Sequence, residues 1–370
     1  MKKLNNLFNY SLIYTKNYFL ESLAVRFPQI IPKPLYVGLS VGTICNFRCK
    51  QCDLWRIPTK PEEYLTTREI KRILKDLRNW LGPFRLVFTG AEPFLRKDII
   101  KILRFASKNN IYTVITSNGW LIDEKMARKI VLSGLDVINV SLDGVNPKTH
   151  DFLRGKSSAF KRAVAALENL KKARGELKTP VIYINTVMMD KNVTQLEELA
   201  KLAKKMGIDA IRFQALESKW LFGSEKYHSQ WFKKTPLWPK NGQKVEKAID
   251  KLKELKKAGL PIKNTLKELE DLKLYYKDPL EIAKKHKFCF TGVRNFSIDE
   301  YGKVKLCFGM EPVGDLLKQK PWKIWYGKRA ERLREVIRNC QRYCRILPCN
   351  RREELGQVFK AFLEKIAMNI

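Results

Sequence analysis

Three closely spaced cysteines are the residues of this 370-residue chain best suited to metal chemistry. Cys45, Cys49 and Cys52 follow the pattern Cys-x3-Cys-x2-Cys, directly after a short apolar segment that predicts a strand. Thiolates at this spacing can hold three corners of a [4Fe–4S] cluster, whereas an electron-transfer cluster takes four cysteines. The next cysteine is Cys289. One iron would therefore remain open to an external ligand, and catalysis at such a cluster needs an open position.

A structural zinc site and inert buried thiols are the two alternatives for this triplet. Structural zinc sites close their coordination with four ligands, in paired Cys-x2-Cys or histidine patterns. Here there is one triplet, and none of the chain's three histidines lies near it in sequence. Residues 1–18 lack the pattern of a secretory signal, and no uncharged apolar segment is long enough to span a membrane. We expect a cytoplasmic, reducing location, where clustered cysteines indicate metal ligation before disulfides.

Six apolar or β-branched segments alternate with charged, helix-like segments. We expect strands at residues 35–41, 86–89, 112–116, 137–142, 181–187 and 210–215. We expect helices near residues 66–80, 97–109, 122–133, 158–174 and 193–206. The alternation predicts an α/β fold of parallel βαβ units with buried strands. Six units are too few for an eightfold barrel, so an open three-quarter barrel or a doubly wound sheet fits, with function at the carboxyl ends of the strands.

Small and polar residues follow the next three expected strands. These motifs are Gly90-Ala91-Glu92-Pro93, Ser117-Asn118-Gly119 and Ser141-Leu142-Asp143-Gly144, with Arg154 thirteen residues after Ser141. Each motif alone is common, because glycine and Asp-Gly mark ordinary turns. Their order on successive strand ends, after the cysteine triplet, resembles the radical S-adenosylmethionine (SAM) enzymes from residue 35 to about residue 216.

The resemblance implies a partial (β/α)6 TIM-like barrel and a defined chemistry. SAM would bind the open iron, and the reduced [4Fe–4S] cluster would cleave it to methionine and a 5′-deoxyadenosyl radical. That radical would abstract hydrogen from a substrate, with the hard chemistry supplied by the cofactors. The cluster would need an electron donor such as a flavodoxin or ferredoxin.

The resemblance also implies which residues contact SAM. Glu92 would accept a hydrogen bond from the methionyl ammonium group, and Arg154 would pair with the methionyl carboxylate. The full expected set is Gln51, Gly90, Ala91, Glu92, Ser117, Ser141, Arg154, Gln214 and Leu216. The alternatives are that Glu92 caps the next helix, Arg154 is a solvated loop residue, Ser141 forms a turn and Leu216 packs in the core. Two residues depart from the family pattern: Gln51 replaces an aromatic residue, and Ala91 replaces a glycine, which requires a negative φ.

Five further cysteines lie near the end of the chain. They are Cys289, Cys307, Cys340, Cys344 and Cys349. A hairpin at residues 297–306, with its turn near 299–302, would bring Cys289 and Cys307 together, and the other three are expected in a basic helical segment. The pattern Cys289-x12-Gly302-x4-Cys307 resembles the SPASM and Twitch extensions of radical SAM enzymes.

Five cysteines suffice for one auxiliary [4Fe–4S] cluster held by four of the five, which is closer to a Twitch extension than to a full SPASM domain. A zinc knuckle and disulfides are the alternatives, and the spare cysteine stays undecided. Phe308 follows Cys307 where enzymes that activate sulfatases tend to have an acidic residue. The sequence therefore disfavours sulfatase activation.

The predicted organisation has five parts. They are an N-terminal helical arm (1–33), the radical SAM partial barrel (34–216), a Trp- and Lys-rich helical connector (217–285), the auxiliary-cluster domain (286–350) and a C-terminal helix (351–370). Within the connector we expect helices at residues 243–258 and 264–276.

The net charge of +34 attracts phosphates, nucleic acid or anionic lipid without selecting among them. No nucleic-acid-binding module is recognisable, so we expect no nucleic-acid partner. Eight arginines between residues 329 and 352 form either a solvated helix or a docking surface for an acidic peptide, a phosphate-bearing substrate or an anionic membrane.

Three functions remain. The first is a radical SAM enzyme that modifies a peptide or a small-molecule cofactor precursor. The second is radical modification of a membrane lipid or lipid-linked glycan, with the N-terminal arm and the tryptophans of residues 217–240 at the inner face of the membrane. The third is a non-catalytic iron–sulfur electron carrier.

Overall fold

One nine-stranded sheet organises the protein. The computed structural model describes residues 2–218, 228–344 and 350. The first six strands are β1 (Tyr36–Ser40), β2 (Arg85–Thr89), β3 (Tyr112–Ser117), β4 (Val137–Ser141), β5 (Val181–Val187) and β6 (Ala210–Gln214). Each pairs in parallel with its sequence neighbour. All six begin and end within one residue of their predicted bounds.

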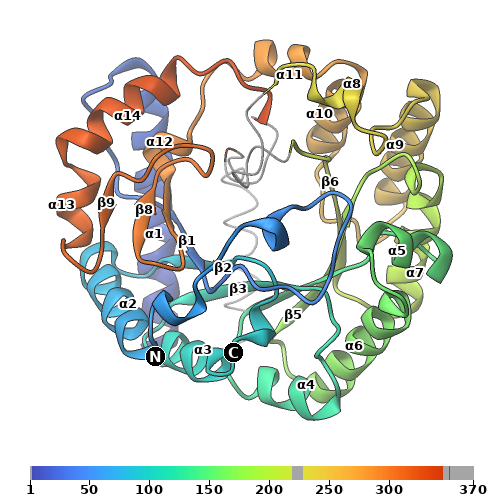
Figure 1. Cartoon of the computed structure of the whole chain (residues 1–370), viewed down its shortest axis with the longest axis horizontal. Coiled ribbons are helices and arrows are strands. Elements are labelled where there is room, and N and C mark those ends of the chain that lie inside the picture. Colours follow the sequence, from blue (N-terminus) through green and yellow to red (C-terminus); the bar gives the residue numbers. More distant parts are fainter. Residues whose placement is uncertain (1, 219–227, 345–349, 351–370) are drawn as a thin grey trace.

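The strand order decides between the two predicted architectures. The order is β6-β5-β4-β3-β2-β1-β7-β8-β9. A doubly wound sheet reverses its strand order at a switch point, whereas β1 to β6 follow one another without reversal. The sheet is the partial barrel, and it remains open because β6 and β9 form its two edges (Figure 1).

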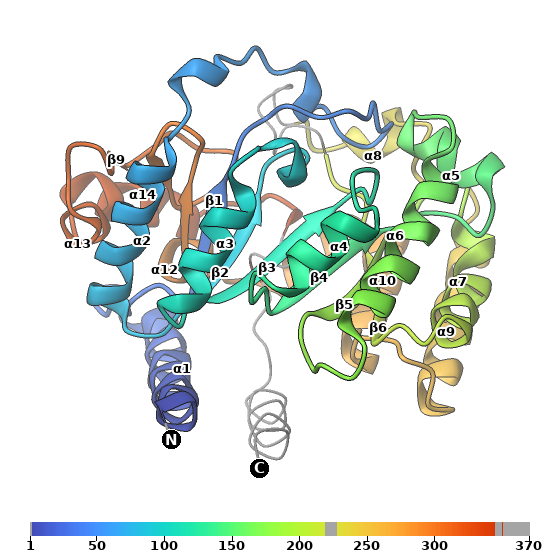
Figure 2. The same ribbon diagram turned by 90° about the horizontal axis from the view of Figure 1, so that it is seen from below.

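Helices cover the outer face of the barrel (Figure 1). They are α2 (Thr67–Leu81), α3 (Ile99–Lys108), α4 (Glu124–Val131), α6 (Ala159–Arg174) and α7 (Leu196–Lys205), and Figure 2 shows α2, α3, α4 and α6 in front of the strands. Helix α2 illustrates why they form. Its buried residues Ile70, Leu74 and Leu77 recur at helical spacing, and Thr66 and Glu69 close its first turn as a capping box.

Helix α5 (Pro147–Arg154) is absent from the predicted helices. The side chain of Asn146 accepts a hydrogen bond from the Thr149 amide at 3.0 Å, Pro147 occupies the first turn, and Gly155 ends the helix with φ +60°. These are ordinary start and stop signals, but the helix is too short for its apolar spacing to stand out. Its last residue is Arg154.

The other elements lie outside the barrel's repeating units. The helices are α1 (Lys2–Arg26), α8 (Trp231–Lys234), α9 (Gly242–Lys257), α10 (Leu266–Lys277), α11 (Pro279–Lys285), α12 (Thr291–Arg294), α13 (Pro321–Trp325) and α14 (Lys328–Arg338). Short 3-10 turns are η1 (Leu54–Arg56), η2 (Pro61–Glu63), η3 (Pro93–Leu95) and η4 (Val193–Gln195).

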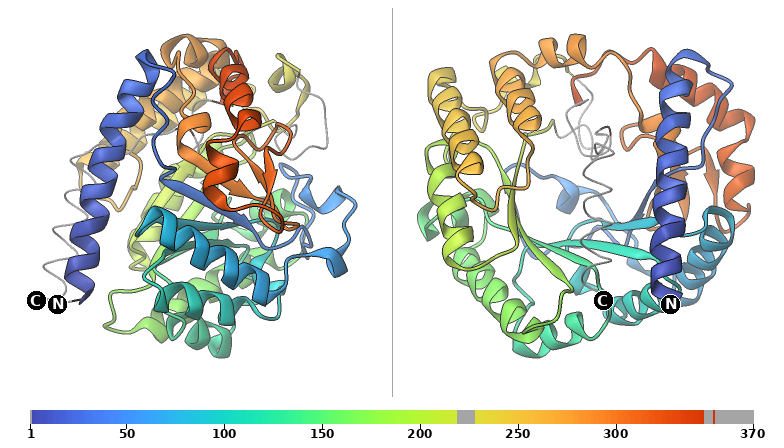
Figure 3. Two further views of the ribbon diagram at one scale, coloured as in Figure 1. Left: turned by 90° about the vertical axis from the view of Figure 1, so that its left-hand side faces the viewer. Right: turned by 180° about the vertical axis from the view of Figure 1, so that it is seen from behind.

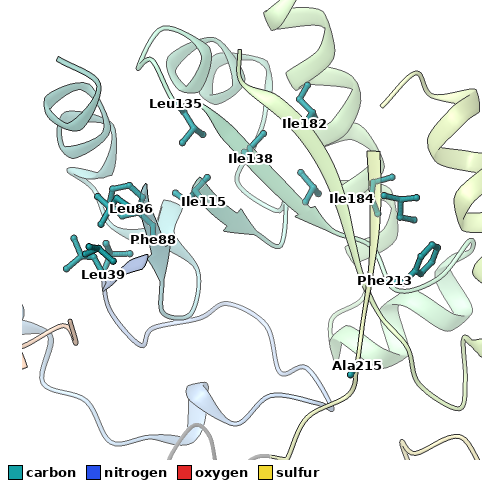
Figure 4. Close-up of a cluster of buried hydrophobic side chains, with 14 of the residues drawn as sticks. Leu39, Leu86, Phe88, Ile115, Leu135, Ile138, Ile182, Ile184, Phe213 and Ala215 are labelled. Carbon is teal, nitrogen blue, oxygen red and sulfur yellow. The ribbon is translucent and has the colours of Figure 1, made fainter. Parts of the chain in front are cut away.

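The two faces of the barrel strands differ in polarity. Apolar side chains such as Leu39, Phe88, Ile138, Ile184 and Phe213 form the buried layer between the strands and the helices (Figure 4). The alternate residues lie on the inner face, and many of them are polar: Ser40, Thr89, Thr116, Asn139, Asn185 and Arg212. The expectation of strands buried in apolar surroundings therefore holds for the outer face, and the inner face is a polar surface.

The cysteine-rich part continues the same sheet. Strand β7 (Asn295–Ile298) pairs in parallel with β1, and β8 (Lys303–Lys305) and β9 (Gly314–Asp315) follow in antiparallel. The predicted hairpin is present, and the carbonyl oxygen of Asp299 accepts the Gly302 amide at 3.1 Å in its turn.

The helical setting predicted for the last three cysteines is wrong for Cys340. Helix α14 ends at Arg338, and Cys340 and Cys344 lie beyond it. Cys349 and the predicted helix at 351–370 lie outside the described residues. Within α14, Arg334 is buried and donates to the carbonyl oxygens of Gly292 (2.9 Å) and Trp325 (2.7 Å), so it is not part of a solvated surface.

The N-terminal arm is a long helix on one flank of the molecule (Figure 3). Tyr14 and Glu21 are buried, and Arg294 of α12 contacts both, with 3.3 Å to the Tyr14 hydroxyl and 3.7 Å to the Glu21 carboxylate. Its opposite side exposes Leu12 and Phe19. Within the described residues, every helix is too short or too polar to cross a bilayer.

The tryptophans of the connector pack inward. The ring of Trp238 lies 4.8 Å from that of Tyr276 and 5.6 Å from that of Trp231, centroid to centroid. Trp231 and Trp238 also contact the main apolar core. Both rings thus pack partly against the core, and the membrane interface predicted for these tryptophans stays a prediction; Trp220 lies outside the described residues.

Candidate functional site

The three N-terminal cysteines lie on one loop between β1 and η1, at the carboxyl ends of the barrel strands. Backbone hydrogen bonds tie this loop to the end of β2, from Ala91 to the carbonyl of Gly42 (3.0 Å) and from Glu92 to that of Ile44 (3.2 Å). A third bond runs from Lys50 to the carbonyl of Leu153 in α5 (2.9 Å). The loop is therefore held at two points of the barrel rim.

Two glycines permit this close approach. Gly90 has φ +110°, and a Cβ there would overlap the carbonyl oxygen of Gly42. Gly155 has φ +60°, and a Cβ there would overlap the carbonyl oxygen of Arg48. Among the described non-glycine residues only Asn110 and Ser158 have positive φ. Ala91 thus has a negative φ, which is the condition for an alanine at this glycine position.

The thiols are close together and partly shielded from water. Burial raises the pKa of Cys45 and of Cys52 to about 11, and it raises the pKa of Cys49 as well. Each thiol also senses the charge of a neighbouring cysteine of the triplet or of Arg154. Three adjacent thiolates are unfavourable here without added positive charge, which bound iron supplies.

The arrangement fits a cluster better than a single ion. Within the described part of the chain, no three His, Cys, Asp or Glu side chains converge on one metal ion. A [4Fe–4S] cluster binds each thiolate through a different iron, so its ligands need not converge. The residues present therefore fit a cluster held by Cys45, Cys49 and Cys52.

Arg154 is buried beside this triplet, so the solvated-loop alternative is wrong for it. Its Nη2 pairs with Oδ2 of Asp143 at 2.8 Å, and its Nη1 lies 4.0 Å from Sγ of Cys49. Its Nε is buried and has no hydrogen-bond partner among the described residues. An unused guanidinium N–H in this position suits an anionic ligand.

Asp143 organises the surroundings of Arg154. Its Oδ1 accepts the Val187 amide at 2.8 Å, and its Oδ2 also accepts Nε2 of Gln51 at 3.2 Å. The backbone amide of Asp143 donates to Nδ1 of His150 (2.9 Å). Burial raises the pKa of Asp143, whereas Arg154 lowers it. Asp143 belongs to one of the motifs found in the sequence, but its Asp-Gly pair also matches an ordinary turn. Its partner Arg154 lies in α5, a helix that the sequence did not predict.

Gln51 lies at the predicted SAM site with one polar atom unused. Its Oε1 is buried and accepts no hydrogen bond within the described ranges. The side chain cannot stack like the aromatic residue it replaces, but it offers an acceptor.

Glu92 caps the turn that follows it, which the sequence analysis gave as the alternative to a contact with SAM. It accepts hydrogen bonds from the amide of Phe94 in η3 (3.2 Å), from the hydroxyl of Ser117 (2.9 Å) and from the amide of Asn118 (2.8 Å). Burial raises its pKa to about 7 against the effect of these bonds. Glu92 and Ser117 therefore join β2 to β3, and their contact with SAM stays a prediction.

The remaining predicted contacts lie at the ends of β4 and β6. Ser141 is the register partner of Asn185, and Gln214 that of Val187. Leu216 is buried, packs against Leu153, and bonds through both backbone groups to the hydroxyls of two tyrosines, Tyr276 (2.8 Å) and Tyr275 (2.9 Å). Leu216 therefore packs in the core, which the sequence analysis gave as the alternative to a contact with SAM.

The structure brings three of the five C-terminal cysteines together. Burial is the main cause that raises the pKa of Cys307 to about 11, and the neighbouring thiols of Cys289 and Cys340 raise it further. Cys344 is half-buried and follows Cys340 closely in sequence. These positions fit an auxiliary cluster whose fourth ligand is Cys344 or Cys349.

Glu217 is a residue that sequence reasoning missed. It follows β6 at the barrel rim, and its Oε1 is buried without a hydrogen-bond partner in the described part of the chain. Burial raises its pKa well above the ordinary value. Burial thus favours the neutral form of this carboxyl group, and the only sequence signal is its place just after a strand.

Comparison with known proteins identifies the domain. The family model "Radical SAM superfamily" matches residues 39–212. An AdoMet-dependent heme synthase of Methanosarcina barkeri is 31% identical over 180 residues, which cover 49% of this chain and 48% of that protein. The mycofactocin maturase MftC of Mycolicibacterium smegmatis is 31% identical over 185 residues, 50% of this chain and 45% of that protein. The chain thus spans about half the length of these curated relatives.

The fold is similar over a longer stretch. Streptococcus suis SuiB, in its complex with the precursor peptide SuiA, aligns with a TM-score of 0.61 and 17% identity over 83% of this chain and 67% of that chain. At this identity the likeness concerns the fold alone. Together, the open barrel, the cysteine loop at its rim and the family match identify residues 39–212 of this chain as a radical SAM domain.

Proposed function

We propose that the protein is a radical SAM enzyme that modifies a peptide or a small cofactor precursor. The observation that carries this proposal is the position of the buried Arg154, whose unused Nε lies on the same guanidinium that approaches Cys49. A cluster-binding loop and an anion-binding side chain then lie at the same end of the barrel. An amino-acid ligand such as SAM could bind the open iron there and pair its carboxylate with Arg154.

Each residue has a role in this proposal. Cys45, Cys49 and Cys52 hold the cluster, which together with SAM supplies a 5′-deoxyadenosyl radical. Arg154, oriented by Asp143, binds the methionyl carboxylate. Gln51 presents an acceptor to SAM through Oε1. We also place Gly90, Ala91, Glu92, Ser117, Ser141 and Gln214 around SAM.

An auxiliary [4Fe–4S] cluster completes the proposal. The mutual proximity of Cys289, Cys307 and Cys340 supports it, with the fourth ligand from Cys344 or Cys349. We propose that this cluster serves the substrate or electron transfer, and that a flavodoxin or ferredoxin reduces the enzyme.

The substrate class draws support from the relatives. A solved structure of SuiB contains the precursor peptide SuiA, MftC is named a mycofactocin maturase, and the heme synthase is named for a cofactor. A peptide or a cofactor precursor is the class that these names share.

The test is SAM cleavage by the isolated protein. The chain is reconstituted anaerobically with iron and sulfide, reduced with dithionite and incubated with SAM, and the products are separated by chromatography. We expect 5′-deoxyadenosine and methionine in equal amounts. A fully loaded, reduced protein that forms neither product contradicts the proposal.

A membrane substrate is a second candidate because one face of α1 exposes several apolar side chains. Leu12, Phe19 and Leu23 are 53%, 57% and 45% exposed and recur at helical spacing. The net charge of +34 complements an anionic lipid surface. Flotation with phosphatidylglycerol vesicles tests this candidate, and phosphatidylcholine vesicles are the control. Binding that disappears in Phe19→Ser/Leu23→Ser supports a membrane surface, and absence of binding contradicts it.

A further inference from the structure

The inner face of β5 and β6 carries an arginine and an asparagine that lie outside the proposed set of SAM contacts. On β6, Arg212 lies between Ile211 and Phe213, which are fully buried in the outer apolar layer. Its side chain therefore lies on the inner face of the barrel. Asn185 of β5 is its register partner, and Ser141 of β4 is the partner of Asn185. These three residues form one row across three strands.

Arg212 and Asn185 both have an unused polar atom. Nε of Arg212 and Oδ1 of Asn185 are buried, and neither has a hydrogen-bond partner among the residues described. Buried polar groups are normally satisfied, because leaving one without a partner is unfavourable. An unused donor and an unused acceptor, adjacent on neighbouring strands, are therefore available to a bound ligand.

A second cation reaches the same face. Residues 261–263 run beside β6, with hydrogen bonds of 2.8 Å from Ile211 to the carbonyl of Pro261 and from Lys263 to the carbonyl of Ile211. The ammonium group of Lys263 lies 5.5 Å from the ring centroid of Tyr183. Tyr183 precedes Asn185 by two residues on β5 and therefore lies on the same face. Arg212 and Lys263 thus approach one region of the inner surface.

We propose that Arg212, Asn185 and Lys263 form a subsite for an oxyanion group of the substrate, either a carboxylate or a phosphate. A guanidinium group binds two oxygens of such an anion at once, and the ammonium group adds a second positive charge. Oδ1 of Asn185 accepts a hydrogen bond from an adjacent N–H or O–H group of the same molecule. This inference deepens the proposed function and rests on it.

The location suits a substrate that must lie beside SAM. Ser141, a predicted SAM contact, stands two strands from Arg212, about 10 Å at the usual spacing between strands. The methionyl carboxylate of SAM is the other source of an oxyanion, and Arg154 is assigned to it at the rim. Two separate cationic groups then serve two anions, one of SAM and one of the substrate.

The test uses the reconstituted full chain with saturating SAM and measures anion binding by calorimetry. Succinate and inorganic phosphate are the probes, and the one that binds more tightly identifies the class of anion. We expect Arg212→Gln to weaken binding of that probe about tenfold or more, and Lys263→Gln to weaken it severalfold. The matched control is Arg104→Gln, which removes the same charge from an exposed position on α3 and should leave binding unchanged.

Three results overturn the subsite: no saturable binding by the wild-type chain, equal binding by Arg212→Gln and Arg104→Gln, or binding that SAM abolishes. If Arg212→Gln fails to fold, the exposed Lys263→Gln decides the question. Formation of 5′-deoxyadenosine by the same wild-type preparation reports on the proposed function separately. A preparation that cleaves SAM but binds neither probe contradicts the subsite alone.

Discussion

Arg154 and Asp143 form a buried ion pair, with 2.8 Å between Nη2 and Oδ2, and their side chains are 11% and 0% exposed. The pair joins the loop after β4 to the end of α5. It also holds the guanidinium beside Cys49, with 4.0 Å between Nη1 and Sγ. The orientation of the predicted carboxylate-binding group is therefore fixed before SAM arrives.

Breaking this pair should destabilise the protein strongly. Asp143→Ala leaves the Arg154 charge buried and removes the acceptor of the Val187 amide, so we expect a loss of about 3–5 kcal/mol in the free energy of unfolding. Urea unfolding measures it. The control is Glu124→Ala, which breaks the exposed pair of Glu124 and Lys172 and should change stability far less, because solvent screens an exposed ion pair. Equal small effects would contradict the structural role of Asp143.

Two glycines with positive φ should respond differently to alanine. Gly155 (φ +60°) lies against the carbonyl of Arg48, whereas a Cβ at Gly175 (φ +54°) would have nothing within 4 Å of it. Both changes strain the backbone, because a residue with a side chain rarely adopts a positive φ. Only Gly155→Ala should also displace the cysteine loop and lower the iron bound after reconstitution. Full iron loading in Gly155→Ala would show that the loop tolerates the displacement.

Loss of the guanidinium should weaken SAM binding. A charge-assisted hydrogen bond contributes about 1.5–3 kcal/mol, so we expect Arg154→Ala to raise the dissociation constant of SAM about tenfold or more. Equilibrium dialysis on the reconstituted protein measures it, with iron content determined on the same sample. Arg104→Ala serves as the control. Wild-type affinity in Arg154→Ala with an intact cluster refutes the assignment.

The C-terminal cysteines should hold about four irons of their own. Cys289→Ala/Cys307→Ala removes two of the three cysteines that lie together, and we expect about four irons per chain to disappear while those of the Cys45 loop remain. Metal analysis gives both numbers. Unchanged iron in this variant, or stoichiometric zinc in the wild-type protein, would make this region a structural knuckle.

The barrel was predictable because each of its strands is a short apolar run between charged amphipathic helices. Their outer-face residues, such as Ile138 and Ile184, are fully buried. The cysteine loop was predictable as well, because its ligands are close in sequence. Helix α5 was not, because its eight residues are too few to show a helical repeat.

Contacts between distant residues were beyond the sequence. The pairing of Arg154 with Asp143 depends on α5 folding back over the end of β4, and that of Cys340 with Cys307 depends on where α14 ends. Leu216 was ambiguous because an apolar residue after a strand suits both a ligand contact and the core. Arg212 gave no signal, since a lone arginine in a strand is ordinary until the register places it on an inner face.

The central claim is that Cys45, Cys49 and Cys52 hold the cluster at which SAM is cleaved. The most direct measurement is the iron content per chain of Cys45→Ala/Cys49→Ala/Cys52→Ala beside the wild-type protein after anaerobic reconstitution. We predict the loss of about four irons, with the iron of the C-terminal cysteines retained. Iron content equal to that of the wild-type protein would contradict the claim.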